Sequence, residues 1–74
     1  MAKDRYGHTL LIGDKIKVVA EGNLNTHIKK YNYEGIIQEF SIDQKIAEIC
    51  FTYLIDEYEY NSYGVIECNC LIKL

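Results

Sequence analysis

Apolar and polar positions alternate most clearly in residues 15–20, where Ile16 and Val18 lie on one face and two lysines lie on the other. An alternation with period two is typical of a β-strand with one buried face and one face in water. Gly13 and Asp14 precede this run and are typical turn residues. The pattern therefore predicts a first strand over 15–20, and the following segments are expected to cover its Ile16/Val18 face.

The segments on either side of this strand are richer in turn-forming residues. Residues 4–12 contain a turn at Tyr6-Gly7 and then a short apolar rise, which predicts a short hairpin or an extended lead-in. Residues 21–32 predict a long surface loop, with one helical turn after Asn25 or Thr26.

A second strand is predicted over residues 33–40, followed by a turn at 41–44. Ile37 and Phe40 are three positions apart, so the alternation is not strict and indicates a bulge or a strong bend. Gly35 would let another part of the backbone approach closely at that bend.

The third predicted strand, residues 45–54, is the longest β-prone run of the chain. Ala47, Ile49, Phe51 and Tyr53 fall on one of its faces. A helix is an alternative, but β-branched and aromatic residues at period two favour a strand.

The segment 56–64 is acidic and rich in tyrosine, and it predicts a hairpin tip or a long loop. A fourth strand is predicted over 65–68, and a tight turn at 69–71 leads into a short last strand. The side chains that we expect to form the core are Ile16, Val18, Ile37, Ala47, Ile49, Phe51, Val65 and Leu71.

This layout resembles an SH3-like small β-barrel, of the broad kind that includes KOW and Tudor domains. The resemblance rests on Gly13-Asp14-Lys15-Ile16-Lys17-Val18, on Gly35-Ile36-Ile37, on the long third strand and on Leu71-Ile72-Lys73-Leu74. The opening Asp4-x-x-Gly7-x-x-Leu10-x-x-Gly13-Asp14 is similar to the first turn of several small bacterial barrel proteins. The resemblance implies one all-β domain, residues 1–74, forming a single SH3-like barrel of about five short antiparallel strands.

Members of this broad group bind RNA, DNA, peptides or other proteins, so the fold alone does not decide the function. KOW motifs usually carry a basic residue just before the glycine of the second strand, whereas this chain has Glu34 there. The use of lysine, isoleucine, asparagine and tyrosine also resembles that of small proteins of AT-rich bacteria and their phages.

Length and composition narrow the class of protein. A chain of 74 residues makes one domain with one thin core. No apolar run approaches the ~20 residues that a membrane-spanning helix needs, and the polar first residues lead into no apolar segment of a secretory signal. We therefore expect a small acidic cytoplasmic protein.

Three cysteines, Cys50, Cys68 and Cys70, are an odd number and argue against a disulfide framework. Cys68 and Cys70 together with His8 or His27 would supply zinc ligands, but their spacing matches no known zinc motif. We expect reduced cysteines, solvated histidines, and neither a metal nor another cofactor. With no nucleophile–base pair and no phosphate-binding glycine loop in the sequence, we expect no enzyme.

The formal net charge is -3, and it is unevenly distributed. Residues 1–33 carry six Lys or Arg against three acids, whereas residues 34–74 carry two against eight. Phosphate neutralisation supplies much of the affinity of nucleic-acid-binding proteins, which are usually basic. The charge therefore favours a protein partner over a nucleic acid.

The acids are densest beside tyrosines, and we predict the partner-binding site there. Its predicted residues are Asp56, Glu57, Tyr58, Glu59, Tyr60 and Tyr63. In an extended segment Tyr58 and Tyr60 would share a face, and the carboxylates would steer a basic partner towards them. A concrete form of this prediction is a phage-type inhibitor or accessory protein that acts on a host nucleic-acid-binding protein. In the plainer alternative the tyrosines only cover the end of the barrel.

A nucleic-acid-binding barrel is the second hypothesis, with contacts from Lys15, Lys17, Lys29, Lys30 and Tyr31. Basic side chains beside an aromatic ring suit phosphate contacts combined with base stacking. This hypothesis requires that folding gathers the lysines on one face, clear of the acids. A third possibility is a homo-oligomer, since a short barrel with an open edge can pair with a copy of itself.

Overall fold

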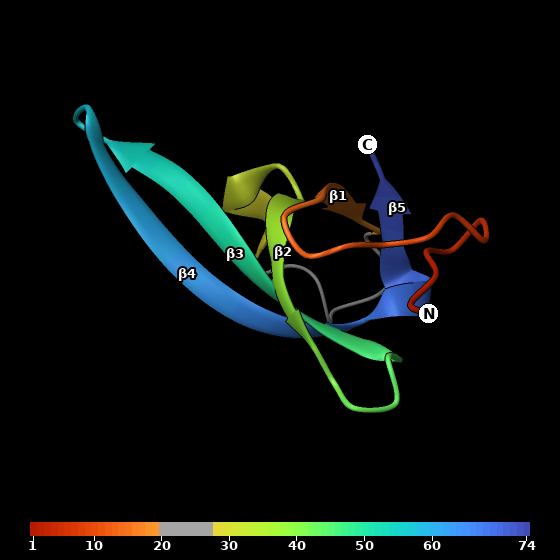
Figure 1. Ribbon diagram of the computed structural model, residues 1–74. Helices are drawn as coiled ribbons and strands as arrows, with labels where there is room; N and C mark the ends of the chain where they lie inside the picture. The colour runs from red at the N-terminus through yellow and green to blue at the C-terminus, as the bar shows by residue number, and fades with distance from the viewer. Residues whose placement is uncertain (20–27) are drawn as a thin grey trace.

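Five antiparallel strands form one sheet in the computed structural model, which describes residues 1–19 and 28–74 (Figure 1). The strands are β1 (Lys15–Val18), β2 (Glu34–Phe40), β3 (Ile46–Ile55), β4 (Tyr58–Glu67) and β5 (Leu71–Lys73), and the 3-10 turn η2 (Cys68–Cys70) joins the last two. Their order in the sheet is β4-β3-β2-β1-β5. The predicted all-β class and the five antiparallel strands are confirmed.

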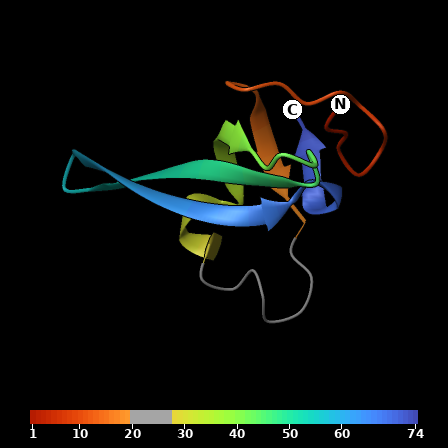
Figure 2. The ribbon, with the colours of Figure 1, turned by 60° about the horizontal axis from the view of Figure 1, so that its bottom comes forward.

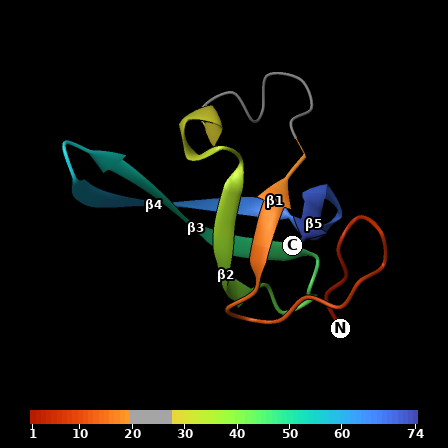
Figure 3. The same ribbon diagram turned by 90° about the horizontal axis from the view of Figure 1, so that it is seen from above.

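The sheet is curled but is not closed into a barrel. β4 and β5 are its two edge strands, and no backbone pairing joins them within the described ranges. Seen from above, β1 and β2 run across the direction of the β3–β4 hairpin, which shows that the sheet is strongly bent (Figure 3). The bend begins in β2, where the register with β3 shifts between Ile37 and Glu39. This irregularity confirms the predicted bulge.

Gly35 lies where the bent strand β2 comes closest to β3. A Cβ at this position would lie only 2.8 Å from the carbonyl oxygen of Cys50. The predicted close backbone approach at Gly35 is therefore confirmed, and any larger residue would push the two strands apart.

Alternating side chains of the sheet form the core. Seven of the eight residues predicted to be buried are buried: Ile16, Val18, Ile37, Ala47, Ile49, Phe51 and Leu71. The prediction for Val65 is wrong, because its side chain is 70% exposed. Val65 pairs with Glu48 on the outer face of the sheet, while the neighbouring pair Ala47 and Ile66 faces the core.

For residues 56–64 the sequence predicts a hairpin tip or a long loop; the segment contains a hairpin tip, and the long loop is wrong. β4 begins at Tyr58 and pairs with β3 over ten residues, and only Asp56 and Glu57 form the turn. Their φ angles of 51° and 71° are both positive, as a two-residue type I′ hairpin requires. Tyrosines on both strands favour the sheet, and the acidic composition concealed this propensity from the sequence analysis.

The end of this hairpin projects from the rest of the molecule as a free ribbon (Figures 1 and 2). The pairing of β2 with β3 reaches only to Cys50, so residues 52–61 extend beyond it. We call residues 52–61 the arm.

The chain before β1 covers the β5 edge. Lys3 and Thr9 form an isolated bridge around the predicted turn at Tyr6-Gly7, and the Arg5 N–H donates to the Leu71 carbonyl at 2.8 Å. Ala2 and Leu10 join the core, a contribution that the sequence analysis missed. Of the long loop predicted at 21–32, residues 21–27, with His27, lie outside the described part, and residues 28–31 form a 3-10 turn.

Candidate functional site

Side chains of the arm that face the same way as the core form a row of exposed apolar groups. Tyr58 lies opposite Ile55, and Tyr60 lies opposite Tyr53, in the register of β3 with β4. Tyr58 and Tyr60 therefore share a face, as the sequence predicts. Their exposed fractions are 71% and 44%, so both rings are accessible at the inner face of the arm.

This row is continuous with the core through a series of ring contacts. The ring of Tyr31 lies 5.3 Å from that of the buried Phe51 and 5.1 Å from that of Tyr53, between centroids. The ring of Tyr53 in turn stacks on that of Tyr60 at 5.5 Å. Aromatic pairs at such distances stabilise each other beyond the area that they bury. The arm is thus anchored by packing at its root, although its end is free.

A lysine lies over the same rings. The Lys30 amino group is 4.8 Å from the ring centroid of Tyr53 and 5.2 Å from that of Tyr31, which is a cation–π geometry. The sequence analysis missed this role for Lys30 and missed Tyr53 as part of the site. Period-two alternation places Tyr53 only on the core face and cannot show which rings meet across the sheet.

Carboxylates lie at the end of the row. Asp56 and Glu57 form the exposed turn, and Glu59 lies on the outer face opposite the exposed Leu54. The whole hairpin, residues 46–67, carries five carboxylates and no lysine or arginine. An apolar surface with two carboxylates at its tip and a third on its opposite face therefore projects from the molecule.

Tyr63 does not belong to this surface. It pairs with Cys50 on the outer face, on the other side of the ribbon from Tyr58 and Tyr60. The pKa of its hydroxyl is raised, first by a hydrogen bond with the Cys50 thiol and by the charge on that thiol, and further by Glu48. The structure thus divides the predicted six-residue site, with five residues at the arm and Tyr63 on the opposite face.

The lysines of the second hypothesis are not brought together. Lys15 and Lys17 alternate with buried residues of β1 and therefore face outward, whereas Lys30 lies over rings of the core face. Lys15 is 3.9 Å from Glu34, and Lys17 pairs with the same residue in the register. Tyr31 is only 7% exposed, so its ring offers little surface for base stacking. Lys29 is exposed on the 3-10 turn.

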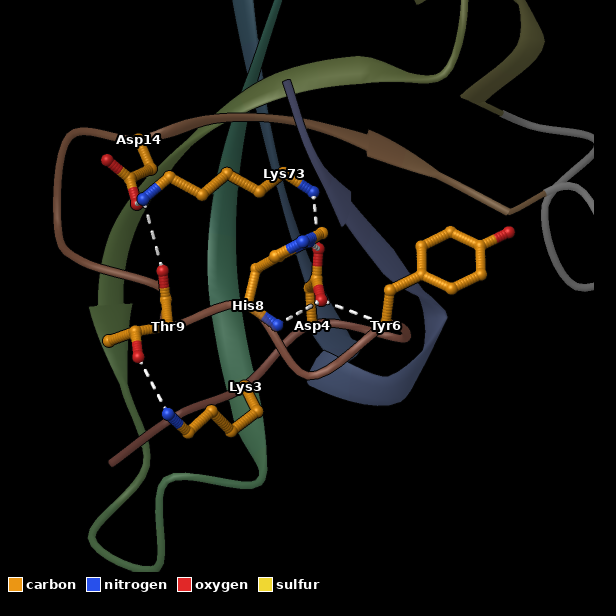
Figure 4. Close-up of polar contacts among 7 residues, drawn as sticks. All are labelled: Lys3, Asp4, Tyr6, His8, Thr9, Asp14 and Lys73. Carbon is orange, nitrogen blue, oxygen red and sulfur yellow. Dashed lines mark hydrogen bonds and ion pairs between the residues drawn. The ribbon is translucent and has the colours of Figure 1, made fainter.

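Asp4 is the one buried charged residue among those described, and the sequence analysis overlooked it. One carboxylate oxygen accepts the N–H groups of Tyr6 and His8, and the other accepts the N–H of Lys73 at 2.9 Å (Figure 4). The His8 ring nitrogen Nδ1 lies 3.1 Å from that second oxygen. Burial alone raises the pKa of Asp4, but the hydrogen bonds from Lys73, His8 and Tyr6 outweigh it and lower the pKa to about 2.

Hydrogen bonds and an ion pair around Asp4 hold the last strand against the first residues of the chain. The Lys73 amino group donates to the Thr9 carbonyl oxygen and lies 3.3 Å from Asp14, while Lys3 donates to the Thr9 hydroxyl (Figure 4). Both oxygens of Asp4 are occupied by donors, so Asp4 has no free lone pair aimed at a substrate. This cluster is therefore structural.

All three cysteines are free thiols in the structure. Burial, followed by the charge of Asp43, raises the pKa of the Cys68 thiol, which keeps it protonated and unreactive. In the part of the chain that is described, no group of three or more His, Cys, Asp or Glu side chains is arranged to hold a metal ion. Nor does that part contain a helix of the length and hydrophobicity needed to cross a membrane.

Comparison of the chain with protein-family models, with curated proteins and with solved structures found no match. The arm, with its exposed tyrosines and carboxylates, is the strongest candidate site that the geometry offers.

Proposed function

We propose that this chain is a non-enzymatic protein-binding module that engages a basic protein surface through its arm. The observation that carries the proposal is the continuous row of rings from the buried Phe51 to the exposed Tyr60. Tyrosine offers a large contact area with few rotamers to freeze on binding, and it recurs at interfaces for that reason. A row that is held in place by stacking loses still less freedom when a partner covers it.

The charge of the arm indicates the kind of partner. Asp56 and Glu57 lie at the tip beside Tyr58, and Glu59 lies on the opposite face of the ribbon. The hairpin itself has no lysine or arginine, and Lys30 lies over the ring of Tyr53 at the root of the arm, so the tip is negative. Such an arrangement accelerates encounter with a positively charged surface and disfavours an acidic one. Proteins that bind nucleic acids carry basic surfaces of this kind. Our specific proposal is an inhibitor or accessory protein, of the type that phages encode, acting on a host nucleic-acid-binding protein.

The test begins with affinity capture of partners and continues with purified components. We expect Tyr58→Ala and Tyr60→Ala each to weaken binding by about 2 kcal/mol, mainly through faster dissociation, as for interface anchors. The pair Glu57→Lys and Glu59→Lys should mainly slow association and reduce its dependence on salt. Surface plasmon resonance at several salt concentrations measures both rates.

Tyr6→Ala is the matched control, because Tyr6 is 66% exposed but lies on the loop before β1, away from the arm. It should leave both rates unchanged, and circular dichroism should show that all variants keep the fold. Affinity that is unchanged in both arm tyrosine variants would contradict the proposal. Loss of binding in Lys15→Ala or Lys17→Ala instead would move the site to the outer face of β1.

A further inference from the structure

Among the residues that the structure describes, none pairs with the outer edge of β4, in contrast to the edge at β5. At β5 the Arg5 and Lys73 N–H groups are engaged by Leu71 and Asp4, so the loop before β1 covers that edge. No segment of residues 1–19 or 28–74 pairs with β4 on the side away from β3. An open edge strand of ten residues offers a row of unpaired backbone groups to another chain.

The register shows which backbone groups of β4 are available. The Cys68 N–H donates to the Lys45 carbonyl at 2.8 Å, which makes this pair a hydrogen-bonded one. Hydrogen-bonded pairs recur at every second residue of an antiparallel ladder. The residues of β4 that bond to β3 are therefore 58, 60, 62, 64 and 66. The N–H and C=O groups of Glu59, Asn61, Tyr63 and Val65 point away from the sheet; at Glu67, the cap of η2, only the N–H does, since its C=O begins the 3-10 turn.

The outer face beside this edge combines apolar surface with carboxylates. Tyr63 and Val65 are 61% and 70% exposed and are successive outward residues of β4. Next to them, Val65, Ile46, Glu48 and Glu39 line a shallow hollow that reaches the bulge of β2. Glu39 and Glu48 lie directly opposite each other in the register. Two like charges in such a pair are unfavourable, so a cation between them would be stabilising.

The charge of the hairpin indicates whether the β4 edge would bind a second copy of this chain or a different protein. Pairing of two copies through β4 would bring two hairpins together, each with five carboxylates and no basic residue. An extended segment that alternates Lys or Arg with apolar residues is complementary instead. Its cationic side chains, on the outer face, would reach Glu48 and Glu39, while their aliphatic stems cover Val65 and Ile46.

We propose that the β4 edge binds an extended, Lys- or Arg-containing segment of the partner as a sixth strand of the sheet. This mode of recognition takes its affinity from main-chain hydrogen bonds and its specificity from alternate side chains. It rests on the proposed protein-binding function and adds the mode of binding and the chemistry of the bound segment.

The experiment uses the whole protein and a synthetic peptide of four Lys-Val repeats. Amide hydrogen exchange is followed by NMR with and without the peptide. The N–H groups of residues 60, 62, 64 and 66 should be protected in the free protein, and those of 59, 61, 63, 65 and 67 should gain protection only with the peptide. A peptide with proline at its centre, which cannot continue a strand, should give little or no gain.

Two pairs of variants separate backbone from side-chain effects. Tyr63→Pro and Tyr63→Ala both remove the ring, but only the proline also removes an outward N–H, and an edge strand tolerates it there. The proline variant should bind the peptide about fivefold more weakly than the alanine variant, the effect of one net hydrogen bond. Glu48→Gln should weaken binding, whereas Glu34→Gln, on the same face but beside Lys15, should not.

The outcomes distinguish this proposal from the function on which it rests. Peptide binding with changes confined to residues 53–60, and no new protection at 61–67, would overturn the sixth strand and leave the arm as the binding site. Protection of the outward amides without peptide, together with a dimer in sedimentation equilibrium, would show that a second copy occupies the edge and would also overturn it. Absence of any peptide binding would overturn both proposals.

Discussion

Ile49 and Val65 are two aliphatic residues of the same hairpin with opposite environments. The Ile49 side chain has no exposed surface, whereas that of Val65 is 70% exposed. They lie on neighbouring strands and on opposite faces of the ribbon. Side chains alternate between the two faces along a strand. A shift of one residue in the register of a strand therefore moves each of its side chains from the core to water, or the reverse.

Ile49→Ala should therefore lower the free energy of unfolding by roughly 2–5 kcal/mol, through lost burial and a residual cavity. For a domain of this size such a loss approaches the entire stability. Val65→Ala is the control and should change stability by less than about 0.5 kcal/mol. Urea unfolding followed by circular dichroism measures both, and equal losses in the two variants would show that the facing of the strands is wrong.

Asp4 should make the fold sensitive to acid. Its pKa of about 2 in the folded state lies below the ordinary value of 3.8, so ionised Asp4 stabilises the fold at pH above about 4. That contribution, on the order of 2 kcal/mol, is lost as the pH falls from about 4 to about 2. Asp4→Asn should lower stability at pH 7 by a similar amount and flatten this part of the pH profile.

Asp56→Asn, at the exposed end of the arm, is the control for Asp4→Asn. It should change neither the stability at pH 7 nor the acid limb of the profile by a comparable amount. Thermal unfolding between pH 2 and pH 7 distinguishes the three proteins. An acid limb that survives in Asp4→Asn would assign the acid sensitivity to another carboxylate.

At the level of the elements, the β3–β4 hairpin depends on a turn whose second residue, Glu57, is unfavourable there. Asp56 and Glu57 both adopt positive φ, which aspartate tolerates but which costs most other L-residues, glutamate included, roughly 1–2 kcal/mol. Glycine adopts it freely, and Asp-Gly is a preferred pair for this turn. The structure therefore retains the Glu57 carboxylate at the end of the arm at some cost in stability, which fits a role in binding.

Glu57→Gly should accordingly stabilise the protein by roughly 0.5–1 kcal/mol while it removes one negative charge from the arm. Glu59→Gly, within β4, should destabilise it instead, since glycine weakens the interior of a strand. Differential scanning calorimetry of the two variants gives the comparison. A decrease in melting temperature for Glu57→Gly would exclude the type I′ turn.

The elements also show how much of this fold the sequence predicts. Alternation placed β1, β2 and β3 within one or two residues, and the three-residue spacing of Ile37 and Phe40 predicted the bulge. The start of β4 was missed because acidic residues and tyrosines suit a loop and an exposed ribbon equally well. The hydrogen bond from Lys73 to Asp4 joins the two ends of the sequence, and the Lys30 contact joins the 3-10 turn to the ring of Tyr53 on β3. Neither could be predicted, because local sequence patterns do not show which distant residues meet.

At the scale of the whole molecule, charge is separated between the arm and the rest. Residues 46–67 carry five carboxylates and no basic residue, and the lysines lie on β1, on the 3-10 turn, directly before β3 and near the two ends of the sequence. A surface so divided should repel a polyanion over the hairpin and attract it only locally elsewhere.

We therefore expect duplex DNA and structured RNA to bind weakly at about 150 mM salt, with measurable binding only at low ionic strength. Fluorescence anisotropy with labelled oligonucleotides across a salt series tests this. Submicromolar affinity at about 150 mM salt would replace the protein partner with a nucleic acid as the main ligand.

The position of β1 between β2 and β5 has a consequence for synthesis on the ribosome. β1 obtains one neighbour from residues 34–36 but the other only from residues 71–73, and the N–H of Lys73 also completes the hydrogen bonds of Asp4. A nascent chain that still holds Lys73 inside the exit tunnel cannot assemble this sheet, however long its earlier part has been free. The complete sheet can therefore form only after residues 71–73 have left the tunnel, whereas the β3–β4 hairpin, whose pairing is local, can form before that.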